Sequence, residues 1–226
     1  MRPADRVPVE ALQIIVTNVP CRWQASRMST DLGPWEPMSV EEVAGLFDRL
    51  TTPWWIAGGY AIELFVGRTF RSHGDIDVLL LRRDQAKVHE VLRGWDIHAA
   101  DPPGTLRLWL AGETLPESVH DIWCREHPDG PWRVQVMLDV ADGEEWVSRR
   151  DPRIRRPIAS LGLRSADGTP FLVPEVQLFY KARGARPKDE TDRAAALPAL
   201  DPEARRWLDD ALALTAPDHP WRAGLV

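Results

Sequence analysis

Residues 54–59 read Trp-Trp-Ile-Ala-Gly-Gly, and residues 75–81 read Asp-Ile-Asp-Val-Leu-Leu-Leu. Each is a short apolar run bounded by glycine or by charged residues, which is typical of a buried strand. The residues between them, 60–67, place apolar side chains at helical spacing and end in a glycine that can stop a helix. We therefore expect a strand, a helix and a second strand in this order.

The two runs carry residues suited to binding a nucleotide. Gly58 and Gly59 stand where the first strand passes into the helix, so the backbone can approach a phosphate and the first N–H groups of the helix can bind it. On a strand, Asp75 and Asp77 would point to the same face, about 6.6 Å apart at Cα for a rise of ~3.3 Å per residue. Two carboxylates this close repel each other unless a proton or a cation lies between them. With oxygen ligands alone, the expected cation is Mg²⁺, which binds one or two carboxylates together with substrate phosphates.

A third carboxylate on a neighbouring strand would complete such a metal site. Residues 132–140 alternate apolar and polar side chains, as a strand with one buried face does. Asp139 falls on the polar side of this pattern, so we expect it to join Asp75 and Asp77. The alternative is an aspartate on an edge strand that faces water.

The remaining patterns predict a mixed α/β protein in three parts. Residues 1–37 lack periodicity and are expected to form an N-terminal extension. Residues 38–173 contain the strand and helix patterns of an α/β core, with antiparallel strands expected over 96–140. Residues 174–226 read as a C-terminal helical segment that begins with a proline at a first helical position.

Composition limits the classes of protein that fit. The chain has 226 residues, with 28 Lys and Arg against 34 Asp and Glu, so its formal net charge is −6. This balance argues against the broad positive field of proteins that bind long nucleic acids. No apolar run approaches the ~18 residues of a membrane-spanning helix, and the first residues make a poor signal peptide. We expect a cytoplasmic protein that does not bind membranes.

Residues 54–63 and 67–78 together resemble the nucleotide-binding motif of the polymerase-beta-type nucleotidyltransferases. They are most similar to aminoglycoside 2''-O-adenylyltransferases and related lincosamide nucleotidyltransferases, which carry a Gly-Gly-Trp-Ala-Ile-Asp block and an Arg-x-His-x-Asp-Ile-Asp block. Tyr60 and Glu63 stand where those relatives have Trp and Asp, and both replacements keep the chemical character. The resemblance implies a polymerase-beta-like nucleotidyltransferase core with a mixed sheet and a C-terminal helical segment.

The resemblance also implies a role for each matching residue. Asp75 and Asp77 would bind the Mg²⁺ that carries the triphosphate, and Asp139 would complete the metal site or act as the base that deprotonates the acceptor hydroxyl. These three form the expected catalytic and metal-binding set. The expected nucleotide contacts in this part of the chain are Gly58, Gly59, Arg71 and His73, and the alternative for His73 is a simple hydrogen bond within the loop.

Residues 174–192 resemble the late motifs of the AbiEii-like nucleotidyltransferases, some of which are toxins that act on tRNA. By that resemblance Lys181, Lys188 and Asp189 would contact the triphosphate or the base. The alternative is that Lys181 is a solvated helix residue and that Asp189 merely favours the dipole of the next helix.

Taken together, the resemblance implies an adenylyltransferase that moves AMP from its co-substrate ATP to a hydroxyl group of a small polar acceptor, in an Mg²⁺-dependent reaction. An aminoglycoside-like polycation, and hence antibiotic resistance, is expected because the net charge is negative and the acidic segments 113–117 and 142–145 could line a cationic pocket. A toxin-like nucleotidyltransferase acting on tRNA is one alternative, with the basic run 149–156 as its expected RNA contact. A non-catalytic nucleotide-binding relative is the other. The sequence leaves the oligomeric state open.

Overall fold

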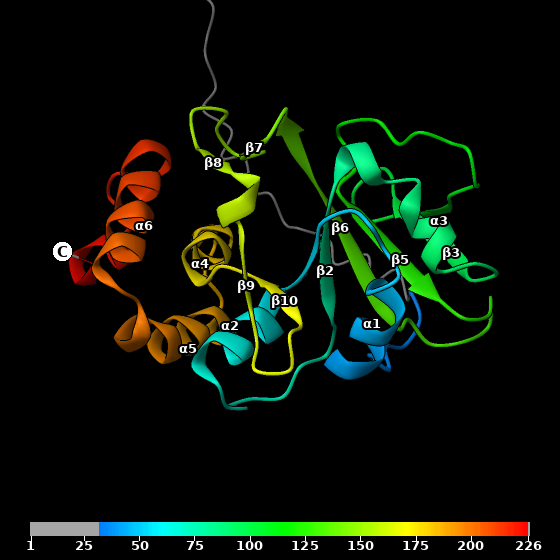
Figure 1. The fold of residues 1–226 in the computed structure, drawn as a ribbon, viewed down its shortest axis with the longest axis horizontal. Coiled ribbons are helices and arrows are strands. Elements are labelled where there is room, and N and C mark those ends of the chain that lie inside the picture. The colour runs from blue at the N-terminus through cyan, green and yellow to red at the C-terminus, as the bar shows by residue number, and fades with distance from the viewer. Residues whose placement is uncertain (1–31, 226) are drawn as a thin grey trace, which may run out of the picture. The chain divides into compact units, whose positions relative to one another are not determined.

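The computed structural model describes residues 32–225, whose helices and strands are shown in Figure 1. The helices are α1 (Val40–Phe47), α2 (Gly58–Val66), α3 (Lys87–Val91), α4 (Pro174–Ala182), α5 (Pro187–Ala196) and α6 (Pro202–Thr215). The strands are β1 (Trp54–Ala57), β2 (Asp77–Leu81), β3 (Asp96–Ala100), β4 (Leu106–Leu108), β5 (Asp121–Arg125), β6 (Val134–Asp142), β7 (Glu145–Val147), β8 (Arg155–Pro157), β9 (Gly162–Arg164) and β10 (Pro170–Leu172). Among residues 32–225, no helix has the length and apolar character that crossing a membrane requires.

The strands of residues 32–225 form one ten-stranded sheet in the order β4-β3-β5-β6-β2-β1-β10-β9, and β7 pairs with both β6 and β8. The sheet is mixed, because β1 runs parallel to β10 and β2 runs parallel to β6, whereas the other neighbours are antiparallel. The predicted α/β fold with a mixed sheet and C-terminal helices is therefore confirmed.

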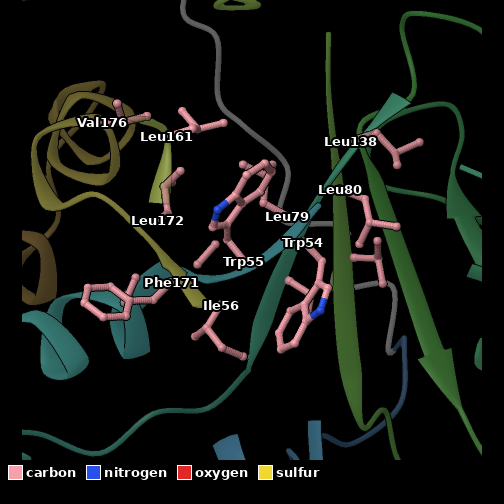
Figure 2. Close-up of a cluster of buried hydrophobic side chains, with 14 of the residues drawn as sticks. Trp54, Trp55, Ile56, Leu79, Leu80, Leu138, Leu161, Phe171, Leu172 and Val176 are labelled. Carbon is pink, nitrogen blue, oxygen red and sulfur yellow. The ribbon is translucent and has the colours of Figure 1, made fainter. Parts of the chain in front are cut away.

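Side chains from both faces of β1 are buried, which explains why its sequence is apolar throughout. Figure 2 shows Trp54 and Trp55 pointing to opposite sides of the strand. Trp54 packs against Phe47 of α1, with ring centroids 5.6 Å apart. Leu172 of β10 and Val176 of α4 lie on the side of Trp55. Helices on both faces of the sheet thus hold β1 in place, and with it the glycine pair at its end.

Two of the C-terminal helices, α4 and α5, pack against α2, which lies much earlier in the chain. α2 contacts both α4 and α5, and α4 also contacts α6. The end of α4 is capped from outside the helix, because the guanidinium of Arg150 donates to the carbonyl oxygens of Phe179 and Tyr180. This packing places the side chains of residues 181–192 beside the start of α2.

The element boundaries differ from the prediction in one place that matters for the site. β1 covers the predicted residues, but β2 begins at Asp77 and not at Asp75. Ile76 still accepts a hydrogen bond from Gln135 N at 2.9 Å, so only Asp75 lies outside the ladder. The hairpin predicted between residues 119–125 and 132–140 is present as β5 and β6. Residues 1–31 of the predicted N-terminal extension lie outside the described residues. The predicted domain boundaries after residue 37 and after residue 173 stay predictions.

Candidate active site

The glycine pair lies at the N-terminus of α2, directly after β1. Gly58 has a φ of +66°, and a Cβ at this position would overlap Asp77 Oδ2. Its N–H donates to Gln177 Oε1 of α4 at 2.8 Å. Glycine is required here because the backbone is left-handed and because the carboxylate of Asp77 lies against it.

Asp75 and Asp77 line one cavity together with the glycine pair, and the cavity has a volume of about 330 Å³. Burial raises the pKa of Asp77 to about 7, and the negative charge of Asp75 adds to this rise, whereas Lys181 and Lys188 oppose it. The structure thus brings the two carboxylates together, as the sequence predicts. A proton or a cation at this position relieves their repulsion.

Asp139 does not join this pair. The register between β2 and β6 places Gln135 beside Asp77, and Asp139 beside Leu81. Four residues along a strand correspond to about 13 Å at a rise of ~3.3 Å per residue. Among residues 32–225, no three His, Cys, Asp or Glu side chains are grouped so that they could hold a metal ion. The prediction that Asp139 completes the metal site is therefore wrong.

Asp139 instead belongs to a buried hydrogen-bonded group. Its Oδ2 accepts hydrogen bonds from Trp146 Nε1 and from Tyr180 Oη, both at 2.7 Å. Burial and the charge of Asp139 raise the pKa of Tyr180 well above its ordinary value, so the phenol stays protonated and donates. The alternation in β6 puts Asp139 on the face of the sheet that carries Gln135, but β7 and α4 cover this end of the strand and supply the donors.

Two residues near Asp77 were not identified from the sequence. Gln135 is its neighbour on β6, and Gln135 Nε2 donates to Asp121 Oδ1 of β5 at 3.1 Å. The charge of Asp121 is one of those that raise the pKa of Asp77. The strand pattern contained both residues, but it did not show which of them faces Asp77, because that depends on the register between strands.

Arg71 and Lys181 meet at a buried aspartate. Arg71 Nε and Nη2 donate to the two carboxylate oxygens of Asp192 at 2.6 and 2.9 Å. Lys181 Nζ lies 2.8 Å from Asp192 Oδ2 and 3.3 Å from Asp189 Oδ1. Asp192 is fully buried, and the sequence analysis assigned it no role. The structure therefore brings two predicted nucleotide contacts together through a residue of α5.

Asp189 organises the start of α5. It accepts hydrogen bonds from Arg186 N and Arg186 Nε at 3.0 and 2.8 Å. Burial alone would raise the pKa of Asp189, but these hydrogen bonds and the charge of Lys181 outweigh burial and lower the pKa to about 2. Lys188 lines the cavity, and no ion pair joins it to any residue in the described part of the chain. Lys188 is thus free to contact a ligand, whereas Asp189 positions its neighbours.

His73 lies behind the glycine pair and is not among the described residues that line the cavity. Its ring stacks on Tyr60 with centroids 4.1 Å apart, and its Nε2 lies 3.1 Å from Glu63 Oε1. Burial lowers the pKa of His73 and so does the charge of Arg71, with Glu63 opposing them, so the ring is neutral at pH 7. Glu63 Oε1 also accepts the N–H of Arg71 at 3.2 Å. The structure therefore places His73 where it supports the loop before β2.

The charges on the cavity wall do not match the expected acidic pocket. Its cationic side chains are Arg71, Arg149, Lys181, Arg183, Arg186 and Lys188, and its carboxylates are Asp75, Asp77 and Asp189. Neither acidic segment, 113–117 or 142–145, lines it. Asp142 and Glu145 instead pair with Arg155 at 2.9 and 3.3 Å. The expectation that these segments line the site is therefore wrong.

The basic run 149–156 does not form a groove into the site. Arg149 lines the cavity, but Arg150 caps α4 as described above. Arg153 pairs with Asp151, and Arg156 Nη1 lies 2.6 Å from Glu175 Oε1. Apart from Arg149, the arginines of this run hold the fold together.

Three solved structures are similar to this chain. The structure of ANT(2'')-Ia in complex with adenylyl-2''-tobramycin is 17% identical, covers 78% of this chain and 97% of that chain, and has a TM-score of 0.50. A solution structure of ANT(2'')-Ia is 18% identical, covers 77% of this chain and 89% of that chain, and has a TM-score of 0.50. The lincomycin-bound adenylyltransferase LnuA is 16% identical, with coverage of 72% and 97% and a TM-score of 0.49. At these identities the first two show a shared fold.

Sequence comparison adds a match over the part of the chain that carries the glycine and aspartate pairs. Residues 39–115 match the family model described as aminoglycoside-2''-adenylyltransferase. Over these residues the chain is similar to that nucleotidyltransferase family. No curated protein matches it. The predicted resemblance to this family is confirmed, whereas the resemblance of residues 174–192 to AbiEii-like motifs stays a prediction.

Gly59 provides a test of how closely the loop before β2 packs behind α2. A Cβ there would overlap Arg71 Nη2 and lie 2.5 Å from His73 Nδ1. Because Asp192 holds Arg71 in place, Gly59→Ala must displace either the loop or the helix start. We expect the KM for the nucleotide to rise by about tenfold, a loss of about 1.4 kcal/mol of binding. The matched control is Gly45→Ala in α1, where a Cβ meets nothing within 4 Å. Equal kinetics for the two variants would contradict the close packing.

Proposed function

We propose that the protein transfers AMP from ATP to a hydroxyl group of a polar acceptor, with Mg²⁺ as the metal. One observation carries the proposal. A single cavity is lined by the paired carboxylates, by the glycine pair at the start of α2, and by Lys181 and Lys188 from the C-terminal helices. Carboxylates for a cation, backbone N–H groups and lysines for phosphates are the parts that phosphoryl transfer needs.

The residues present fit a divalent cation. Asp75 and Asp77 offer oxygen ligands only, and the raised pKa of Asp77 shows that the pair favours a proton or a cation at this position. Mg²⁺ suits such a pair, because it completes its octahedron with water and substrate phosphates. When bound, the cation supplies charge neutralisation at the phosphates that react. Asp75 and Asp77 are the residues proposed to hold it.

The other residues of the cavity position the triphosphate. The N–H of Gly58 is already bonded to Gln177, which leaves the next N–H groups of the first turn of α2, at Gly59 and Tyr60, to bind a phosphate oxygen. Lys181 and Lys188 line the same cavity as Asp77, so we expect them to contact the phosphates of a nucleotide bound there. Arg71 and Asp192 fix Lys181 in place. In this proposal, the chain contributes to catalysis by positioning the triphosphate and by neutralising its charge.

Two classes of acceptor follow from the resemblances. The family description supports an antibiotic hydroxyl, as in an aminoglycoside, and with it a role in antibiotic resistance. The late-motif resemblance supports tRNA. A non-catalytic relative is disfavoured, because Asp75 and Asp77 are both present in the cavity.

Mass spectrometry of reaction mixtures tests the proposal. Purified protein, Mg²⁺ and each of the four nucleoside triphosphates are incubated with tobramycin, with lincomycin or with total tRNA. We expect a product that carries AMP, formed from ATP and lost in Asp77→Asn. Transfer of a different nucleotide, or product formation that Asp77→Asn does not change, would contradict the proposed donor or the proposed site.

A further inference from the structure

One face of α4 presents polar side chains to the cavity, although most of the helix is buried. Gln177, Tyr180 and Lys181 line the cavity, and they stand at positions i, i+3 and i+4, which share one face of a helix. Lys181 is held by Asp192, and Tyr180 donates to Asp139. Gln177 is the member of this face to which the proposed function gives no contact with the nucleotide.

The carboxamide of Gln177 has one orientation that satisfies its surroundings. Its Oε1 accepts the backbone N–H of Gly58 at 2.8 Å. A backbone N–H donates and does not accept, so the oxygen of the carboxamide has to face Gly58 and the NH₂ group has to point elsewhere. The bond to Gly58 therefore fixes which end of the Gln177 side chain is the donor.

The NH₂ group of Gln177 faces the cavity and has no partner among residues 32–225. Gln177 is 5% exposed and lines the cavity beside Gly58. Its Nε2 donates to none of the described residues, Asp77 included, and it is not one of their side-chain atoms that are sealed from solvent without a partner. Because buried amides are nearly always hydrogen-bonded, two N–H donors directed into a cavity mark a contact for a ligand.

The surroundings of Nε2 favour a phosphate oxygen as the acceptor of these donors. Nε2 shares one carbon atom with Oε1, so the donors lie at the glycine turn, where the first turn of α2 presents the N–H groups of Gly59 and Tyr60. Lys181, one turn further along α4, adds a positive charge to the same wall. Neutral donors and a cation grouped in this way are complementary to an anion with several oxygens, such as a phosphate.

We propose that Gln177 binds the donor nucleotide directly, with Nε2 donating to an oxygen of the triphosphate while Oε1 holds Gly58 in its left-handed conformation. The inference rests on the proposed function and adds a binding residue to the same site. It gives Gln177 one role in the fold and a separate role in the ligand contact. Gln177→Glu keeps the first role and loses the second, because a carboxylate accepts hydrogen bonds and donates none.

Calorimetry with two probes, both in the presence of Mg²⁺, tests the inference. The probes are α,β-methylene-ATP and inorganic triphosphate, which lacks the ribose and the base. The proteins compared are the wild type, Gln177→Glu, Gln177→Met and the control Gln85→Glu. Gln177→Met offers neither donor nor acceptor and adds no charge. Gln85 is also buried, and its Oε1 accepts the N–H of Leu115 at 2.7 Å, but it does not line the cavity.

We expect the wild type and Gln85→Glu to bind each probe with affinities that agree within about twofold. Gln177→Glu and Gln177→Met should each bind both probes about tenfold to 100-fold more weakly, which is the effect of one hydrogen bond to a charged group. The loss should be the same for α,β-methylene-ATP and for triphosphate, because the contact is made to a phosphate.

Three results would overturn the inference and leave the proposed function in place. Equal affinities of the wild type and Gln177→Glu would show that Gln177 only supports Gly58. Full affinity in Gln177→Met would show that the added charge alone weakens binding in Gln177→Glu. A loss for α,β-methylene-ATP without a loss for triphosphate would assign the contact to the ribose or the base. If the wild type binds neither probe, the proposed function itself fails.

Discussion

Asp77→Asn is expected to lower the rate of nucleotidyl transfer by about 10³-fold or more, while the protein keeps its fold. The carboxylate of Asp77 lies against Gly58 and lines the cavity together with Asp75. An amide is neutral and binds Mg²⁺ weakly, so the cation and its triphosphate lose their anchor. The measurement is product formation with ATP and Mg²⁺ under saturating conditions.

The same substitution is expected to stabilise the metal-free protein at neutral and alkaline pH. Because the pKa of Asp77 is raised to about 7, the folded state binds more protons than the unfolded state between about pH 4 and pH 7. The free energy of unfolding of the wild type therefore falls as the pH rises through this window, and Asp77→Asn removes that fall. Between about pH 5 and pH 8 the variant should gain about 2 kcal/mol relative to the wild type.

The pH experiment is done in the presence of a chelator, by thermal or urea unfolding of the wild type and two variants. Asp129→Asn is the matched control, because Asp129 is exposed in the loop between β5 and β6. The free energy of unfolding of Asp129→Asn should equal that of the wild type at every pH. If Asp77→Asn is destabilised at about pH 8, burial and the charge of Asp75 do not disfavour the ionised Asp77 carboxylate as the structure implies. Full activity in Asp77→Asn would remove the basis for the metal site.

Asp192→Ala is expected to destabilise the protein by about 3 kcal/mol or more, because it removes the buried carboxylate that pairs with both Arg71 and Lys181 and leaves these two cations without it. Arg71 comes from the loop before β2, and Lys181 comes from α4, and both are within hydrogen-bond distance of Asp192. Asp192 is fully buried, so water cannot replace it without opening α5. The measurement is the free energy of unfolding from urea titration.

A second variant separates positioning from stability. Asp192→Asn keeps the shape and should fold at low temperature, but it weakens the attachment of Arg71 and Lys181 to α5. We expect its KM for ATP to rise by about tenfold. Asp210→Ala, which removes an exposed carboxylate of α6, is the control for charge and should change neither quantity. A loss below about 1 kcal/mol in Asp192→Ala would show that the buried network contributes little.

Local sequence was sufficient for the first half of the site. The apolar run before Gly58 predicts β1, and the helical spacing after Gly59 predicts α2, because both patterns repeat over a few residues. Asp75 and Asp77 meet because they are two residues apart in an extended segment, whatever the rest of the chain does. The two aspartates lie together even though β2 begins at Asp77, because Ile76 still accepts a hydrogen bond from the backbone of β6.

The prediction for Asp139 failed for a reason that no local pattern contains. The alternation in β6 identified the correct face, but the place along that face depends on the register with β2, a strand that lies more than 50 residues earlier in the chain. The register puts Gln135 beside Asp77. Trp146 and Tyr180 then bury Asp139 at the far end of the strand.

The sequence by itself determined the strand, the glycine turn, the helix and the convergence of Asp75 and Asp77, because these depend on contacts between residues close in the chain. The tertiary structure alone decided which polar residue neighbours Asp77, that Asp192 joins Arg71 to Lys181, and that the cavity wall carries more cations than carboxylates. These features arise from strand register and from the packing of α4 and α5 on α2, which bring together residues more than 50 positions apart. Such long-range contacts are selected by the burial of whole elements, and a single stretch of sequence does not specify them.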